Sequence, residues 1–115
     1  MGEVVQFHRP GVQARTLKRL RRGQYPIERQ LDLHGQTLAQ AERALHRFLS
    51  ACDHSGARCV RIVHGKGLSS PGGRPVLKGQ IVVWLREHHA VNAFCSAPRS
   101  DGGTGAMYVL LSARR

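Results

Sequence analysis

The chain has 115 residues, which is room for one domain with a modest hydrophobic core. Its formal net charge is +11, from 18 Lys and Arg against 7 Asp and Glu, so polyanions are the natural partners, nucleic acid first. No apolar run approaches the roughly 18 residues of a membrane span, which predicts a soluble cytoplasmic protein. The three cysteines lack the paired spacing of a zinc site and are expected to be buried thiols.

The first 30 residues form a basic segment, with seven Lys or Arg against two Glu. Residues 12–22 fit a short basic helix that ends before Gly23 and Pro26. We therefore expect residues 1–30 to be a basic N-terminal arm that packs loosely on a domain formed by residues 31–115. A solvated, partly disordered tail is the alternative interpretation.

A carboxylate and an imidazole lie two positions apart in residues 31–35, which read Leu-Asp-Leu-His-Gly. The segment has the apolar alternation of a strand, in which residues i and i+2 share one face. Asp32 and His34 would then point together toward a ligand, while Leu31 and Leu33 face the core. Such a pair suits acid/base chemistry. The structural alternative is that Asp32 caps a turn and His34 packs at a strand end.

A helix and a second strand follow. Thr37 with Gln40 matches a capping box, apolar residues then repeat at helical spacing, and Gly56 provides the end. The apolar run of residues 59–63 is a strand that leads directly into His-Gly-Lys-Gly at residues 64–67. Glycines on both sides of the lysine allow positive φ and close approach to a phosphate. An ordinary glycine-rich turn is the alternative for this loop.

The remaining elements complete an α/β fold. Apolar spacing predicts a helix over about residues 76–89, and residues 91–96 and 106–112 read as strands. The order β-α-β-α-β-β predicts a two-layer α/β sandwich, with two helices on a mainly parallel four-stranded sheet. The loops after the first two strands would share one sheet edge, and glycine-rich residues 102–105 join them there if the last strand runs antiparallel.

Four segments in this order resemble the Smr (small MutS-related) domain family, in particular its small stand-alone bacterial members. They are residues 31–35, 63–67, 77–85 and 102–111, and the resemblance extends over about residues 24–113. It implies a fold similar to the C-terminal domain of the third translation initiation factor, and endonuclease activity on DNA or RNA. A long N-terminal extension for ribosome docking is not expected before these segments, and this counts against a ribosome-linked role without excluding it.

The resemblance also implies site residues. Its Asp-x-His motif falls on Asp32 and His34, and its His-Gly-x-Gly motif falls on residues 64–67. His34, oriented by Asp32, would activate the nucleophile, and His64 would protonate the leaving oxygen. We expect the substrate phosphate to be bound by loop residues, namely Gly35, Gly65, Lys66, Gly67, Gly103, Thr104 and Gly105.

The substrate decides whether a metal is needed. RNA supplies its own 2′-hydroxyl nucleophile, whereas DNA cleavage would need an activated water and Mg²⁺ or Mn²⁺, with Asp32 as the one obvious ligand. We expect a monomeric nucleic-acid endonuclease with no membrane partner. The alternatives are a nucleic-acid-binding module without turnover and a protein-interaction adaptor, which would not need the Asp-x-His pair.

Overall fold

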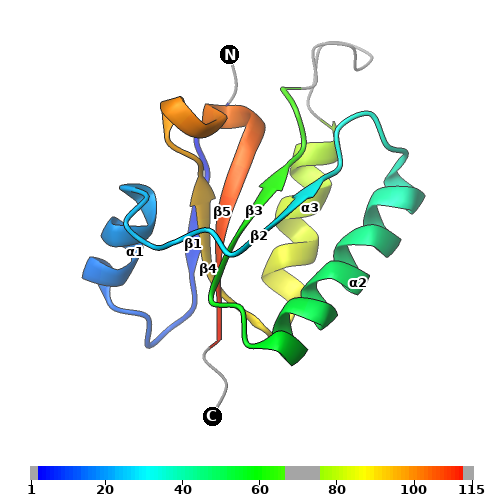
Figure 1. Ribbon diagram of the computed structural model, residues 1–115. Coiled ribbons are helices and arrows are strands. Elements are labelled where there is room, and N and C mark those ends of the chain that lie inside the picture. Colours follow the sequence, from blue (N-terminus) through cyan, green and yellow to red (C-terminus); the bar gives the residue numbers. More distant parts are fainter. Residues whose placement is uncertain (1–2, 67–75, 113–115) are drawn as a thin grey trace.

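The computed structural model describes residues 3–66 and 76–112 (Figure 1). These residues form one mixed sheet with helices on both faces. The elements in chain order are β1 (Gln6–His8), α1 (Ala14–Arg21), β2 (Arg29–Asp32), α2 (Leu38–Ser55), β3 (Cys59–Val63), α3 (Val76–Glu87), β4 (Val91–Ser96) and β5 (Ala106–Leu111). Two short 3-10 helices, Arg99–Asp101 and Gly103–Gly105, lie between β4 and β5. No helix within these ranges is long and apolar enough to cross a membrane.

The five strands lie in the order β1-β4-β5-β3-β2. β2 pairs with β3 in parallel, whereas the other neighbouring pairs are antiparallel. β2, β3 and β4 therefore run in one direction, and β5 lies between β3 and β4 in the opposite direction. Every residue of β5 is buried. Its unbroken apolar run is typical of a central strand that is covered on both faces.

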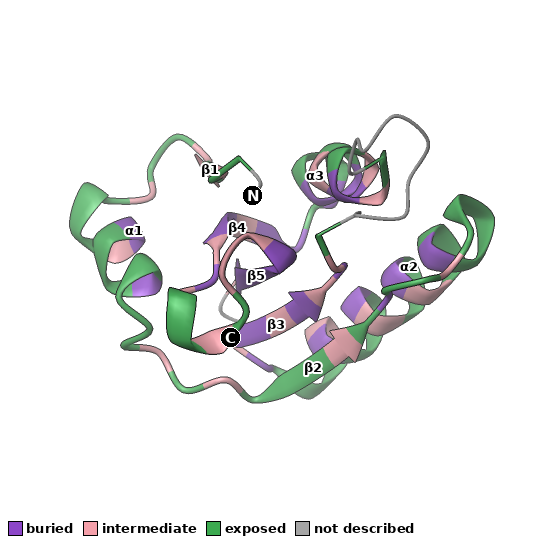
Figure 2. Ribbon diagram, turned by 90° about the horizontal axis from the view of Figure 1, so that it is seen from above, coloured by how far each residue is buried: buried purple, intermediate pink, exposed green. Residues whose placement is uncertain are grey.

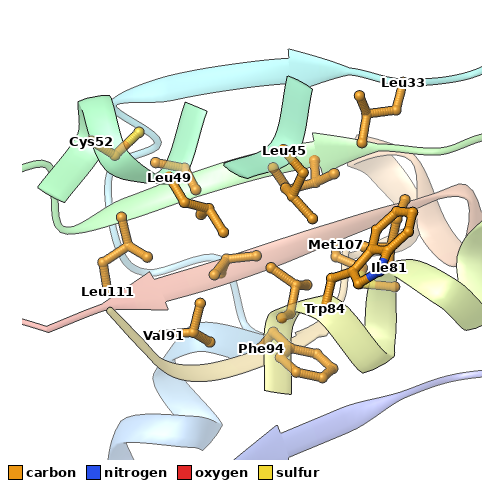
Figure 3. Packing of buried hydrophobic residues seen from close by; sticks show 14 of the residues in the cluster. Leu33, Leu45, Leu49, Cys52, Ile81, Trp84, Val91, Phe94, Met107 and Leu111 are labelled. Carbon is orange, nitrogen blue, oxygen red and sulfur yellow. The ribbon is translucent and has the colours of Figure 1, made fainter. Parts of the chain in front are cut away.

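Helix α2 is formed by local signals that agree with its packing. The Thr37 hydroxyl accepts from the Gln40 backbone N–H at 3.2 Å, and the Gln40 side chain accepts from the Thr37 N–H at 3.1 Å. Gly56 ends the helix at φ +77°, in the left-handed region that glycine favours. Figure 3 shows Leu45 and Leu49 directed from α2 toward the sheet. The helix expected after Thr37 is confirmed.

Helix α3 lies beside α2 on the same face of the sheet (Figure 1). Its Ile81 and Trp84 side chains belong with Met107 of β5 to one apolar core, and Leu33 lies in the same core (Figure 3). Full burial of a side chain such as Leu or Ile contributes about 1.5–3 kcal/mol, so this core is a main source of stability.

The opposite face is covered by the basic N-terminal segment. Figure 2 shows α1 across the sheet from α2 and α3, with buried positions on the side that faces the strands. Leu17 and Leu20 of α1 are buried in a second apolar core with Cys95 and Tyr108. β1 extends the sheet by pairing with β4.

Arg9, which follows β1, is hydrogen-bonded to the region where α3 ends and β4 begins. Its guanidinium donates to the backbone carbonyl oxygens of Arg86, His88 and Val91 at 2.7, 2.8 and 2.6 Å. Two of these bonds satisfy carbonyl groups at the C-terminal end of α3, and the third satisfies that of the first residue of β4. The expectation of a loosely packed arm or a disordered tail is therefore wrong for the described part of the arm, which supplies a strand and a helix.

The α/β sandwich predicted from the sequence is confirmed, with differences in detail. β1 is an additional strand, and the short basic helix expected within residues 12–22 is confirmed as α1. Because α1 covers the face opposite α2 and α3, helices lie on both faces of the sheet and the two-layer description is incomplete. Among the described strands only β2 and β3 form a parallel pair, because β5 separates β3 from β4 and β1 runs antiparallel to β4. The sheet is therefore mixed rather than mainly parallel as expected. The three cysteines are buried free thiols as expected, and burial raises the pKa of Cys59 to about 12.

Candidate active site

The loops that follow β2 and β3 begin side by side at one edge of the sheet. Asp32, the last residue of β2, pairs with Val63, the last residue of β3. β5 starts at the same point, since Val63 also pairs with Ala106. The three glycine-rich segments therefore converge at this edge, as the sequence argument predicts for an antiparallel last strand (Figure 1).

Asp32 and His34 form a hydrogen-bonded pair on the outer surface. Asp32 Oδ1 accepts from His34 Nδ1 at 2.7 Å and from the His34 backbone N–H at 3.0 Å. Between them Leu33 is fully buried, so the strand alternation turns both polar side chains outward. The His34 and Asp32 side chains are 69% and 49% exposed. The shared face inferred from the sequence is confirmed.

The electrostatics of the pair follow from these bonds. The hydrogen bond from the His34 side chain, and then the one from its backbone N–H, lower the pKa of Asp32 below its usual value. Asp32 is therefore ionised near neutral pH. A carboxylate at Nδ1 favours the imidazole tautomer that carries its proton there, which leaves His34 Nε2 as a proton acceptor. The arrangement can orient a general base toward a bound ligand.

His64 lies in a different environment. Only 4% of its surface is exposed, and its Nδ1 donates to the Gly65 carbonyl oxygen at 2.7 Å. Its Nε2 is buried without a hydrogen-bond partner among the described residues. Burial above all lowers the pKa of His64, and the Lys78 charge acts in the same direction. The structure therefore does not bring His64 beside His34 as a second exposed imidazole.

Several loop amides that were expected to bind phosphate already have partners inside the protein. The N–H groups of His64 and Gly65 both donate to the Gly105 carbonyl oxygen at 3.0 Å. The Gly103 and Gly105 N–H groups donate to carbonyl oxygens of their own loop, also at 3.0 Å. These bonds fasten the loops to one another. Gly65, Gly103 and Gly105 thus shape the site rather than offer free donors.

Close packing explains glycine at two of these positions. Gly65 has φ +80°, and a Cβ atom there would lie 3.4 Å from His34 Cβ. A Cβ atom on Gly105 would lie 3.2 Å from Lys66 Cγ and 3.5 Å from the Gly65 carbonyl carbon. Because neither glycine has a side chain, the loop after β3 can lie against His34 on one side and Gly105 on the other.

Lys66 is an exposed cation at this edge, beside Gly105. Gly35 is also exposed, at φ +78° in the turn after His34, and Thr104 is half-buried in the segment before β5. Gly67 lies outside the described residues. Among the residues expected to bind phosphate, Lys66 is the one that brings a positive charge.

The described side chains do not form a ready-made metal centre. No group of three or more His, Cys, Asp and Glu side chains within residues 3–66 and 76–112 is arranged to bind an ion. Asp32 Oδ1 already accepts two hydrogen bonds from His34. The Asp101 carboxylate accepts from the Tyr108 hydroxyl and pairs with Arg61 Nε at 3.3 Å. These carboxylate oxygens therefore do not provide the ligand set of an Mg²⁺ or Mn²⁺ ion that is held by protein side chains alone.

Two further residues organise this edge and were missed in the sequence. Arg61 donates to the Asp101 carbonyl oxygen at 3.0 Å and to the Gln30 side chain, which ties the segment before β5 to β2 and β3. Lys78 is only 5% exposed, and its ammonium donates to the Glu3 carbonyl oxygen. The sequence did hold a signal for each residue: Arg61 is a charge inside the apolar run of β3, and Lys78 is a charge at a position of α3 that has the spacing of core residues.

Sequence comparison identifies a family and relatives. The family model of the Smr domain matches residues 31–112. The ribosome rescue factor SmrB of Yersinia enterocolitica is 41% identical over 105 residues, which are 91% of this chain and 56% of that protein. The Escherichia coli O157:H7 protein of the same name is 40% identical over 107 residues, 93% of this chain and 55% of that protein. The chain thus spans little more than half the length of these relatives.

Solved structures agree with the sequence match. The crystal structure of YdaL, a stand-alone small MutS-related protein from Escherichia coli, matches with a TM-score of 0.82 and 33% identity over 95% of this chain and 83% of that one. The Smr domain of Thermus thermophilus MutS2 matches with a TM-score of 0.65 and 31% identity over 73% of this chain and 98% of that one. Because the family match, the relatives and both folds agree, the chain belongs to the Smr domain family.

Proposed function

We propose that this chain is a nucleic-acid endonuclease in which His34 is the general base and Asp32 orients it. The observation that carries the proposal is the 2.7 Å hydrogen bond between Asp32 Oδ1 and His34 Nδ1, on an exposed edge of a protein with a net charge of +11. An exposed imidazole held by a carboxylate suits proton transfer, and the charge suits a polyanionic substrate. Membership of the Smr family supports the same function.

On RNA the pair can act without a cofactor. His34 Nε2 accepts the proton of the 2′-hydroxyl, whose oxygen attacks the adjacent phosphorus and displaces the 5′-oxygen. Asp32 stabilises the imidazolium that forms, since its lowered pKa keeps it ionised. The Lys66 ammonium binds the phosphoryl oxygens. Because His64 is buried, the leaving oxygen takes its proton from water, and His64 instead holds the loop through its bond to Gly65.

DNA lacks the 2′-hydroxyl, so its cleavage needs a water that is activated by other means. An Mg²⁺ or Mn²⁺ ion would have to be shared between Asp32 and a substrate phosphate, because the described side chains do not fit an ion held by protein alone. RNA is therefore the preferred substrate in this proposal.

The name of the relatives supports a proposal for the location of the substrate. The Yersinia enterocolitica SmrB protein is named a ribosome rescue factor, and this chain covers 56% of it. We place the action of this chain on RNA of the translation machinery in the cytoplasm. This part of the proposal departs from the sequence interpretation, in which a ribosome-linked role was disfavoured.

End-group analysis tests the proposal. The purified chain is incubated with labelled single-stranded RNA, supercoiled DNA and linear duplex DNA, each with Mg²⁺, Mn²⁺ or EDTA, and a His34→Ala variant is run beside it. We expect cleavage of RNA in EDTA, with cyclic phosphate and 5′-hydroxyl ends, and its loss in the variant. Cleavage of DNA alone, and only with metal, would contradict the RNA assignment. Equal cutting by the variant would contradict the role of His34.

A nucleic-acid-binding module without turnover is the second candidate. The burial of His64 favours it, because only one imidazole of the two motifs is exposed. Retention of RNA in a filter-binding assay, with no cleavage of any substrate under any of these ionic conditions, would identify this function.

A further inference from the structure

A basic groove lies at the same sheet edge, between the end of α1 and the end of β4. Its volume is about 660 Å³. Residues that line it include Val4, Arg21, Lys66, Ala97, Arg99 and Thr104. We propose that the basic groove binds the nucleotide next to the scissile phosphate, with its phosphate on the cations and its base on the apolar lining. The inference rests on the proposed function and adds a substrate subsite to it.

Lys66 connects the basic groove to the Asp32–His34 pair. It lines the groove, and a Cβ atom on Gly105 would lie 3.2 Å from its Cγ. The residue before it, Gly65, lies against the His34 Cβ. A phosphodiester that lies between His34 and Lys66 therefore leads directly into the groove.

The cations of the basic groove are not neutralised by carboxylates. Arg21, Lys66 and Arg99 are exposed, and none of them is in an ion pair within the described parts of the chain. Arg21 donates to the neutral Gln6 side chain at 3.2 Å. The nearby Asp101 carboxylate is held by Arg61 instead. Uncompensated positive charge in a concave site favours a phosphate group.

The rest of the lining suits a nucleobase. Val4 and Val5 line the groove from the segment before β1, and Cys95 and Ala97 line it from the end of β4. Val4 is 77% exposed, so its side chain is accessible to a ligand. A volume of about 660 Å³ lies within the roughly 300–1,000 Å³ of small-molecule pockets, which is room for one nucleotide. Bases in a duplex are stacked and paired, so the nucleotide that enters must be unpaired.

Charge reversal tests the phosphate contacts. Binding of a fluorescent single-stranded RNA pentanucleotide is measured by anisotropy in a His34→Ala background, so that cleavage plays no part. Arg21→Glu and Arg99→Glu should each weaken binding at least ~10-fold, because each loses a charge-assisted phosphate contact. Arg15→Glu is the matched control, since it makes the same charge change on α1 outside the groove. It should weaken the affinity for the RNA by less than ~3-fold. Equal losses in all three variants would overturn the proposal.

Removal of single bases tests the apolar lining. Each nucleotide of the pentanucleotide is replaced in turn by an abasic one. One position should lose affinity by ~3-fold or more, and Val4→Asp, which places a carboxylate in the lining, should remove that dependence. Equal affinity for all the abasic strands would show that the groove holds no base, and would also overturn the proposal.

These binding measurements do not depend on turnover. Groove-specific binding without cleavage by the parent chain would support the subsite and refute the endonuclease. Cleavage by the parent chain with equal losses in groove and control variants would refute the subsite alone. Circular dichroism verifies folding, and Arg21→Gln replaces Arg21→Glu if the latter does not fold, with an expected loss of ~3-fold or more against Arg15→Gln.

Discussion

Two histidines end neighbouring strands of this protein and lie in opposite environments. His34 and His64 are each followed by a glycine with positive φ, +78° at Gly35 and +80° at Gly65. The His34 side chain is 69% exposed and bonded to a carboxylate. His64 is 4% exposed and bonded to a backbone carbonyl group. Similar local motifs have therefore produced one surface group and one core group.

Strand alternation explains the difference. In β3 the even positions 60 and 62 face the core beneath α2 and α3, and His64 continues that phase. In β2 and its extension the odd positions 31 and 33 face this core, so His34 falls on the outer phase with Asp32. The alternation of each strand, rather than the motif, decides which histidine is exposed.

The largest expected effect separates the two histidines by catalysis. His34→Ala removes the exposed base and should lower kcat at least ~100-fold, the usual scale for loss of an acid/base group. Asp32→Asn keeps the shape of the pair but not its charge, and should lower kcat by less. Initial rates at saturating RNA measure both, with exposed His46→Ala on α2 as the control. An unchanged rate in His34→Ala would break the comparison.

A smaller effect on rate is expected at His64. His64→Ala removes a buried ring and its bond to Gly65, so the free energy of unfolding should fall by about 2–4 kcal/mol. The loop would be less well placed, and kcat should fall by ~10-fold. Urea denaturation and initial rates measure the two effects. A loss of rate as large as that of His34→Ala, with stability unchanged, would instead make His64 the general acid.

Lys66 tests whether the loop of buried His64 also contacts the substrate, because Lys66 is the exposed cation of that loop. Lys66→Ala should raise KM by ~3-fold or more and reduce the salt slope of RNA binding by roughly 0.7, since one phosphate contact is lost. Lys18→Ala, an exposed cation of α1, is the control. A fall in kcat with KM unchanged would mean that Lys66 contacts the substrate only in the transition state.

The smallest expected effect is in the pH dependence of stability. The pKa of buried His64 is lowered in the folded state, so the unfolded chain binds more protons below about pH 6.5. The free energy of unfolding should then fall as the pH drops below that value, by at most about 1.4 kcal/mol per pH unit for this group. His64→Gln should show a shallower fall in urea titrations. His88, whose pKa is also lowered by burial, contributes equally in both proteins. An identical pH dependence would contradict the assigned burial of His64.

Local signals were sufficient for much of the fold and for half of the candidate site. The capping box at Thr37 and the left-handed Gly56 define α2 through neighbours within a few residues. The outward pair of Asp32 and His34 follows from alternation with buried Leu33. Each of these features depends on residues that are adjacent in the chain, which is why the sequence alone could predict them.

Long-range pairing decided the rest. β1 has three residues and is held by β4 and by Arg9, which no pattern within residues 1–30 reports. The Gly105 carbonyl oxygen takes the N–H groups of His64 and Gly65 only because β5 lies next to β3. The burial of His64 was accessible in principle, because alternation places it on the same face of β3 as the apolar Val60 and Ile62 and opposite the charged Arg61.

The last strand along the described chain is also the central strand of the sheet. β3 and β4 are joined only through β5, and β1 reaches the sheet only through β4. During synthesis, β3 and β4 therefore remain open edges until residues 106–111 have left the ribosome. Folding is expected to be slow, because β3 pairs with β5, and β1 with β4, across long stretches of the sequence. A nascent chain that stops before β5 would expose both apolar cores and require chaperone protection.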